Sequence, residues 1–250
     1  MARESHFLGA IAIIIASVVG TPVWAVSIHP GAPTLRAGSL QSGSDTTESF
    51  RLDNGMRIAV ATITRTVSRE QQGSTPVYRV VIRNQSSRGD SSRSETIIDA
   101  HSFALISQTV RATSDSGQVA YDKGRLIGWI QAANDSLRIF ELKPDSLVFP
   151  DDGALPWLVT MLPLGPGKKF ELLSFNMWAK REVPLAFTVV REDTVRYRSR
   201  LDTCWVVQVT GRGGPPGFDY FNWVSRRTHQ LLQAAFLKTD AAAQFWIKRR

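Results

Sequence analysis

Short runs of alternating apolar and polar residues follow one another along most of the chain, from about residue 50 to the C-terminus. The runs are rich in Val, Ile, Thr and aromatic residues and are separated by polar turns, as is typical of β-strands. The triplet Asp122-Lys123-Gly124 between two runs suits a tight hairpin, because glycine readily adopts a positive φ. A single sheet of roughly a dozen strands must curl to cover its own apolar face. We therefore predict a mainly β fold, an antiparallel curved sheet that forms a half-barrel or open barrel.

Residues 151–167, DDGALPWLVTMLPLGPG, interrupt this alternation. Asp151 and Asp152 can cap a helix, Pro156 suits its first turn, and two later prolines would end it. The segment predicts one short mid-chain helix between two halves of the sheet. Its faces are apolar nearly all round, which indicates burial. Two interpretations stay open: a lid or plug over an apolar cavity, or a crossover that packs in the core.

An arginine-rich run, VRYRSR, stands out among the predicted strands. In a strand, Arg196, Arg198 and Arg200 would share one face, while Val195 and Tyr197 would share the other. Such a row is either a solvated face or a contact surface for an acidic partner or for lipid headgroups.

The N-terminus has the features of a signal peptide. Arg3 is followed by an apolar stretch from Leu8 to Val19 and by the small-x-small pattern that ends at Ala25. A dozen apolar residues are too few for a membrane span of about 20. We expect residues 1–25 to be removed by cleavage after Ala25, which would leave a soluble periplasmic or extracellular protein.

The segment after the predicted cleavage site differs in composition from the rest of the chain. Residues 26–49 are rich in Ser, Gly, Thr and Pro and contain few large apolar residues, which favours a flexible arm. Residues 50–250 then form a single domain. With 43% apolar residues in a chain of 250, that domain can bury a real core.

The net charge indicates which classes of partner the protein can bind, and the cysteine content shows whether it can form a disulfide. The net charge of +8 makes the surface attractive to acidic polymers, anionic headgroups or nucleic acid. Export argues against nucleic acid, so an acidic envelope component is the expected partner of a basic surface. Cys204, the sole cysteine, cannot form an internal disulfide and reads as a small buried residue in CWVVQV. We expect a monomer.

Enzymatic signatures are weak. No metal-ligand spacing, Gly-x-Ser-x-Gly elbow or phosphate loop is present in the sequence. His101 and His229, the histidines of the predicted domain, read as turn or surface residues. We therefore predict a protein without enzymatic activity, cofactor or metal, with a hydrolase as the alternative left open.

Two segments carry a family resemblance: ALPWLVTMLPLGPGKKF at residues 154–170 and YFNWVSRRTHQLLQAAF at residues 220–236. Together with the signal segment and the meandering strands, they resemble an exported family, domain of unknown function 3108. More distantly, the chain resembles the lipoprotein carriers of the LolA/LolB type. The resemblance covers residues 50–250. It implies that Trp223 ends one strand, that a polar turn follows, and that the next strand returns across the sheet.

The resemblance also implies a concave apolar face that accepts acyl chains in the carriers. On this basis we predict a non-catalytic protein that binds an apolar or amphiphilic ligand, either a lipid or an acylated protein. The alternative is a structural or interaction module of the cell envelope, with a filled core and a basic contact face at Arg196, Arg198 and Arg200. Aromatic side chains fill cores as readily as they line cavities. The predicted ligand-binding residues are Trp129, Trp157, Met161, Phe175, Trp178 and Trp223.

Overall fold

The computed structural model describes residues 25–36, 40–150, 155–211, 218–238 and 244–249. Most of these residues belong to strands. The strands of the first half are β1 (Val26–Ile28), β2 (Gly43–Asp53), β3 (Met56–Gln72), β4 (Thr75–Ser86), β5 (Ser91–Asp99), β6 (Leu105–Ala112), β7 (Ser116–Asp122), β8 (Arg125–Gln131) and β9 (Arg138–Leu142). The remaining elements are β10 (Phe149–Pro150), α1 (Leu155–Met161), β11 (Lys169–Asn176), β12 (Arg181–Tyr197), β13 (Arg200–Thr210), β14 (Phe218–Ser225), β15 (Leu231–Lys238) and β16 (Gln244–Arg249).

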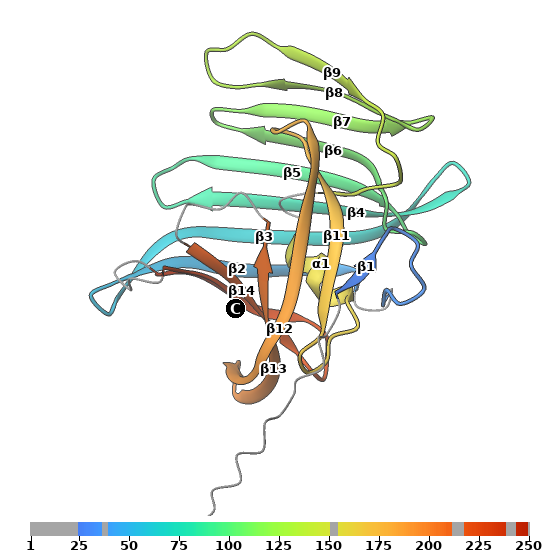
Figure 1. Ribbon diagram of the computed structural model, residues 1–250. Helices are drawn as coiled ribbons and strands as arrows, with labels where there is room; N and C mark the ends of the chain where they lie inside the picture. The colour runs from blue at the N-terminus through green and yellow to red at the C-terminus, as the bar shows by residue number, and fades with distance from the viewer. Residues whose placement is uncertain (1–24, 37–39, 151–154, 212–217, 239–243, 250) are drawn as a thin grey trace, which may run out of the picture.

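The strands form one continuous sheet, in the order β1, β11 to β16, then β2 to β9. Consecutive strands along this path pair antiparallel, except that β1 runs parallel to β11. The short β10 also pairs parallel with β11. Strands β2 to β9 form a broad curved layer, and β11 to β13 cross in front of it (Figure 1). The predicted mainly β fold, an antiparallel curved sheet with one short mid-chain helix, is therefore confirmed.

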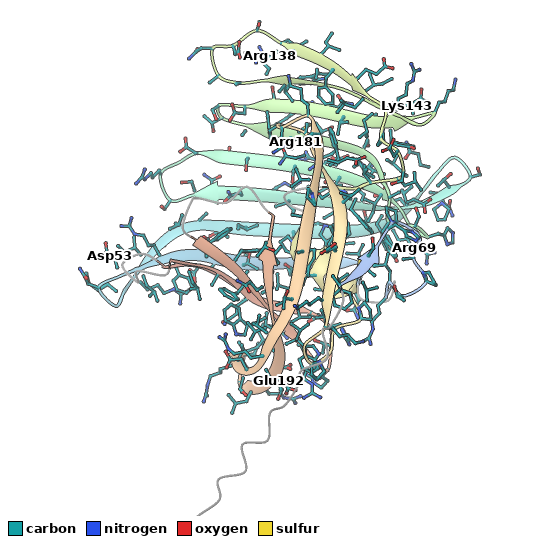
Figure 2. All side chains as sticks on the ribbon, in the orientation of Figure 1. Asp53, Arg69, Arg138, Lys143, Arg181 and Glu192 are labelled. Atoms are coloured by element: carbon teal, nitrogen blue, oxygen red, sulfur yellow. The ribbon has the colours of Figure 1, made fainter. Side chains whose placement is uncertain are left out.

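The main core lies where the two halves of the sheet face each other. Strand alternation directs Val67, Val80 and Phe187 into it. Helix α1 lies within this core, and its Trp157 and Met161 are fully buried. The helix is thus a crossover that packs in the core. Charged side chains such as those of the labelled Asp53 and Arg138 lie at the ends of strands (Figure 2).

Two smaller clusters complete the interior. Phe175 and Met177, at the end of β11, pack with Phe140 and other apolar residues of β6 to β9. On the face of β13 and β14 that points away from the main core, Cys204 and Trp223 form a third cluster. Apolar side chains thus occupy both faces of the second half of the sheet.

The prediction of a flexible arm over residues 26–49 is wrong for the described part of that segment. Residues 26–28 form β1, and β2 begins at residue 43. Ile28, Ala32 and Leu40 are buried in the main core. Amino-acid composition does not predict this arrangement, because strands pair through backbone groups that every residue type has. The three buried apolar side chains attach the segment to the main core. Residues 1–24, which contain most of the predicted signal peptide, lie outside the described residues.

The arginine-rich run is also not a single strand. Tyr197 ends β12 and pairs with Arg200, which begins β13. Arg198 occupies the turn between them with φ 53°. Arg196, Arg198 and Arg200 are all exposed, but they surround the tip of a hairpin and do not form a row on one strand face. The guanidinium carbon of Arg198 lies 5.2 Å from the ring centroid of Tyr197.

Candidate ligand-binding site

Two hollows open between the sheet and helix α1, and Asp45, Arg65 and Leu231 line both of them. We call the first, of about 140 Å³, the polar hollow. Its lining consists of Leu40, Gln41, Ser42, Gly43, Ser44, Asp45, Arg65, Val67, Trp157, Thr160, Gln230 and Leu231. The second, of about 80 Å³, is the apolar hollow. Its lining consists of Asp45, Thr47, Ile63, Arg65, Ile82, Pro156, Tyr220, Leu231 and Ala234.

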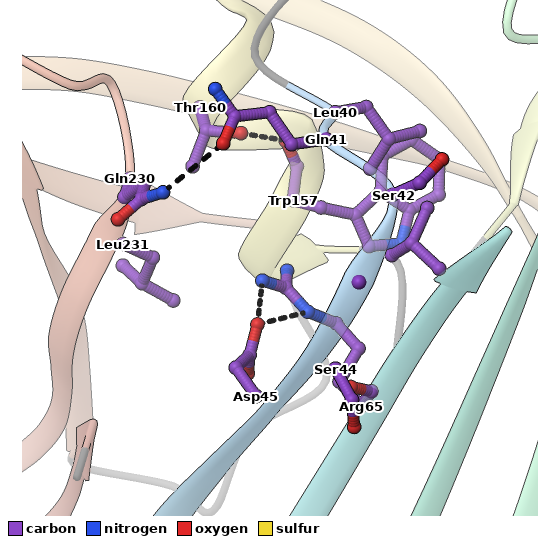
Figure 3. A pocket seen from close by; sticks show the side chains of 12 residues that line it. Leu40, Gln41, Ser42, Ser44, Asp45, Arg65, Trp157, Thr160, Gln230 and Leu231 are labelled. Atoms are coloured by element: carbon purple, nitrogen blue, oxygen red, sulfur yellow. Dashed lines mark hydrogen bonds and ion pairs between the residues drawn. The ribbon is translucent and has the colours of Figure 1, made fainter.

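An ion pair stands at the boundary of the two hollows. Asp45 on β2 and Arg65 on β3 are direct cross-strand partners. Both side chains point to the concave face of the sheet, which Val67, two residues further along β3, also faces. Nε and Nη2 of Arg65 donate hydrogen bonds to Oδ2 of Asp45 (Figure 3). Only 15% of the Asp45 side chain and 21% of the Arg65 side chain are exposed, so solvent screens this pair less than an ordinary surface pair.

Trp157, which lines the polar hollow, carries a buried hydrogen-bond donor. Its side chain comes from α1 and is 1% exposed. Nε1 has no hydrogen-bond acceptor among the described residues. The helix backbone fixes the residue, and its carbonyl accepts a hydrogen bond from Oγ1 of Thr160 at 2.6 Å. A buried donor without an acceptor costs about 1–3 kcal/mol, which a ligand oxygen would recover.

The β14–β15 turn forms one rim of the polar hollow. Nε2 of Gln230 donates to Oε1 of Gln41 at 3.4 Å and so joins this turn to the segment before β2 (Figure 3). Next to it, Arg36 donates to Nε2 of His229. Burial, and secondarily the positive charge of Arg36, lower the pKa of His229. The imidazole is therefore neutral at pH 7 and can accept this hydrogen bond.

The apolar hollow has a lining suited to hydrocarbon. Ile63, Ile82 and Ala234 point into it from three strands, and Tyr220 closes one side. The ring of Tyr220 packs against Phe236 with 4.5 Å between centroids. Both hollows are smaller than the sites of drug-sized ligands, which usually measure about 300–1,000 Å³. A cavity of about 150 Å³ holds a molecule the size of benzene.

The predicted ligand-binding residues do not meet at one place. Trp157 and Met161 both belong to the main core, but of these two only Trp157 lines the polar hollow, and Phe175 is buried in the second cluster. Trp178 packs at the edge of the second cluster and Trp129 is half-buried on β8. Trp223 lies in the third cluster, where its indole N–H donates a hydrogen bond to Asp193 at 2.9 Å.

Sequence reasoning missed Asp45, Arg65, Gln41 and Gln230. Alternation along residues 63–67 could have placed Arg65 on the inner face, but its partner lay in the segment assigned to the arm. No group of three or more His, Cys, Asp or Glu side chains in the described part of the chain could hold a metal ion. No helix among the described residues is both long and apolar enough to cross a membrane.

The late hairpin matches the predicted arrangement. Trp223 lies near the end of β14, a polar turn follows, and β15 returns across the sheet. The turn arginines have acidic partners on the neighbouring hairpin: Arg226 pairs with Glu192 at 2.7 Å, and Arg227 pairs with Asp202 at 3.4 Å. These two arginines therefore hold the turn against β12 and β13.

Three solved structures that match most of the chain share little sequence with it. A β-barrel-like protein of the domain of unknown function DUF1849 from Brucella abortus is 12% identical, with a TM-score of 0.49; the match covers 86% of this chain and 97% of that one. A protein with a YmcC-like fold from Bacteroides fragilis is 8% identical, with a TM-score of 0.37 and coverage of 84% and 94%. A DUF1329 family protein from Desulfovibrio piger is 9% identical, with a TM-score of 0.25 and coverage of 85% of each chain.

The family model gives a direct assignment. No curated protein matches the chain. Residues 49–249 match the model described as "Protein of unknown function (DUF3108)", which confirms the resemblance drawn from the sequence. The match extends from the middle of β2 to the last residue of β16 and thus includes the path of the sheet except β1 and the first part of β2. The chain belongs to the DUF3108 family of proteins of unknown function.

Proposed function

We propose that this protein binds a small amphiphilic molecule, or one end of a larger one, at the two hollows beside α1, without chemical conversion. The observation that carries the proposal is Trp157, which lines the polar hollow and whose buried indole N–H has no acceptor among the described residues. A ligand oxygen at this point would satisfy it. The adjoining apolar hollow would take the hydrocarbon part of the same molecule.

The Asp45–Arg65 pair would orient such a ligand. Because both residues line both hollows, a carboxylate or carbonyl at the boundary would lie near the guanidinium of Arg65 and near Trp157. Arginine offers five N–H donors, and the Asp45 oxygen engages two of its nitrogens, so donors remain for a second acceptor. The volumes fit a short acyl segment or a small ring and not a whole lipid.

Isothermal titration with octanoate tests this proposal, with octanol and butyrate as probes for the two ends of the molecule. We expect saturable binding of octanoate that weakens about tenfold in Trp157→Phe, since one hydrogen bond to a charged group is lost. Trp178→Phe, at the edge of the second cluster, is the matched control and should bind like the unaltered protein. Absence of saturable binding, or equal weakening in both variants, would contradict the proposal.

A second candidate function is that of an interaction module that contacts an acidic envelope component. Its contact residues would be Arg196, Arg198 and Arg200, which are exposed together at the β12–β13 tip. Pull-down from envelope extracts with the unaltered protein and with a variant carrying Glu at all three positions tests it. Equal recovery of all partners by both proteins would rule this surface out.

Export with cleavage after Ala25 is part of the proposal. Val26, the residue after the predicted cleavage site, begins β1, so the cleaved chain would keep every described strand. Fractionation of the producing cells followed by intact-mass measurement tests this point. A mass that corresponds to residues 26–250 outside the cytoplasm is expected, and a full-length cytoplasmic species would refute it.

A further inference from the structure

Three arginines lie side by side on the outer face of the first half of the sheet. Arg83 on β4 is the direct cross-strand partner of Arg93 on β5, and Arg93 is the direct partner of Arg111 on β6. We call these three residues the arginine row. Directly paired residues point to the same face, with Cβ atoms about 5 Å apart. The strands that carry the row are neighbours in the broad layer of Figure 1.

The row faces away from the main core. On β4, Val80 and Ile82 point toward the main core, so the alternating position 83 points outward. On β5, the same alternation directs Ile98 inward and position 93 outward. All three arginines are exposed. The site is thus on the opposite side of the sheet from the two hollows.

The charge of the row is poorly neutralised. Arg93 pairs with Glu95 at 3.0 Å, but Glu95 also pairs with Arg79. Among the described residues, no ion pair neutralises Arg83 or Arg111. Like charges directly opposite each other destabilise a sheet. A row of three therefore lowers stability in the free protein, and a bound anion would relieve that repulsion.

The surroundings of the row are rich in hydrogen-bonding groups. An open hollow of about 580 Å³ contains all three arginines, and its other lining residues are Thr62, Thr64, Asn84, Gln85, Ser91, Ser92, Ala112 and Thr113. A second hollow of about 300 Å³ continues along the same face at Arg93, Glu95, Thr109 and Arg111. Hydroxyl and amide groups flank the guanidinium groups, and Ala112 is the sole apolar residue in either lining.

We propose that the arginine row binds an acidic polysaccharide through its carboxylate groups. Arginine matches carboxylate geometry with two parallel hydrogen bonds. The positive charges repeat at the strand spacing of about 4.8 Å, which is comparable to the length of one sugar residue in an extended chain. The hydroxyl and amide groups would bind the sugar hydroxyls. A membrane-binding surface would instead carry large apolar side chains that enter the headgroup region, and the two linings have none.

Binding of polygalacturonate oligomers, with dextran oligomers as the neutral counterpart, tests the proposal. One variant carries Gln at positions 83, 93 and 111. The matched control carries Gln at Lys123, Lys143 and Arg181, which removes the same charge from exposed positions outside the two linings. We expect binding of polygalacturonate but not of dextran, about tenfold weaker in the row variant, since three exposed ion pairs are lost. The control should bind within about twofold of the unaltered protein.

Three outcomes would overturn the proposal. Equal weakening in both variants would mean that overall charge, and not the row, attracts the polymer. Stronger row-dependent binding to phosphatidylglycerol vesicles than to polygalacturonate would make the row a membrane contact. Absence of polygalacturonate binding would also refute it. The single substitution Arg111→Gln should weaken binding in the same direction, and the unfolding midpoint of each variant shows whether the fold is retained.

Discussion

A single carboxylate oxygen, Oδ2 of Asp45, accepts hydrogen bonds from both Nε and Nη2 of Arg65, at 3.1 and 2.5 Å. The two residues are direct cross-strand partners on β2 and β3. Exposed ion pairs contribute about 0–1 kcal/mol. This pair is largely shielded from water, so loss of one partner leaves the other charge unpaired in a poorly solvated place.

We predict that Arg65→Met lowers the free energy of unfolding by about 2 kcal/mol. Urea denaturation measures the loss. The control is Arg125→Met, which breaks the exposed pair with Glu141 on β8 and β9 and should cost less than about 0.5 kcal/mol. Asp45→Asn in the Arg65→Met background should recover part of the loss. Equal losses in the two arginine variants would contradict the prediction.

Trp157 and Trp223, both buried, differ in whether the indole N–H has a hydrogen-bond acceptor. Nε1 of Trp223 donates to Oδ2 of Asp193 at 2.9 Å, whereas Nε1 of Trp157 has no acceptor among the described residues. Phe in place of either residue removes the same atoms. Trp223→Phe should therefore cost about 1–2 kcal/mol more than Trp157→Phe. Thermal or urea unfolding of the two variants, side by side, measures the difference, and a larger loss for Trp157→Phe would refute this account.

His229 makes stability depend on pH. Burial, and then the charge of Arg36, lower the pKa of His229 in the folded state below the usual value of 6.5. The unfolded chain therefore binds this proton first, so the contribution of His229 is complete above about pH 6.5 and declines as the pH falls toward the folded pKa. Unfolding midpoints from pH 7.5 to 5 should fall less in His229→Gln than in the unaltered protein. Arg36→Gln should reduce the decline only in part, because burial remains, and identical pH profiles for all three proteins would disprove the link.

Alternation in the sequence was enough to predict the curved sheet and the buried helix. It failed at residues 195–201, because the hairpin turn there consists of Arg198 and Ser199. Arg198 takes a positive φ, which is uncommon for residues other than glycine. Arg198 and Ser199 lack the Asn-Gly or Asp-Gly pattern that marks two-residue hairpin turns, so two strands joined by a tight turn resemble one continuous strand in the sequence.

The candidate site was less visible in the sequence than the fold. Trp157 was among the predicted ligand-binding residues, but nothing in its local sequence separated it from the tryptophans that fill cores. The Asp45–Arg65 pair depends on the register between β2 and β3. That register cannot be derived once the first half of β2 is assigned to a flexible arm. Strand pairing, which composition does not record, therefore decides which residues meet at the hollows.

Gly128 on β8 lies where the neighbouring strands β7 and β9 approach so closely that there is little room for a side chain. Its direct cross-strand partner is Phe140 on β9. A Cβ atom at Gly128 would clash with the carbonyl oxygen of Gln118 and would lie 2.7 Å from the Phe140 ring. The first contact is with backbone of the neighbouring strand, which cannot rotate away. Gly128→Ala should therefore cost about 2–3 kcal/mol.

Gly117, on the adjacent strand β7, is the matched control for this substitution. A Cβ atom there would meet the flexible end of Met177 at 3.1 Å and a methyl group of Ile130 at 3.2 Å. Methionine adapts its rotamer to such crowding, so Gly117→Ala should change the free energy of unfolding by less than about 1 kcal/mol. Urea denaturation of both variants provides the comparison. Equal free energies of unfolding for Gly128→Ala and Gly117→Ala would contradict the prediction. That result would mean that β8 can move away from Gln118 without loss of stability.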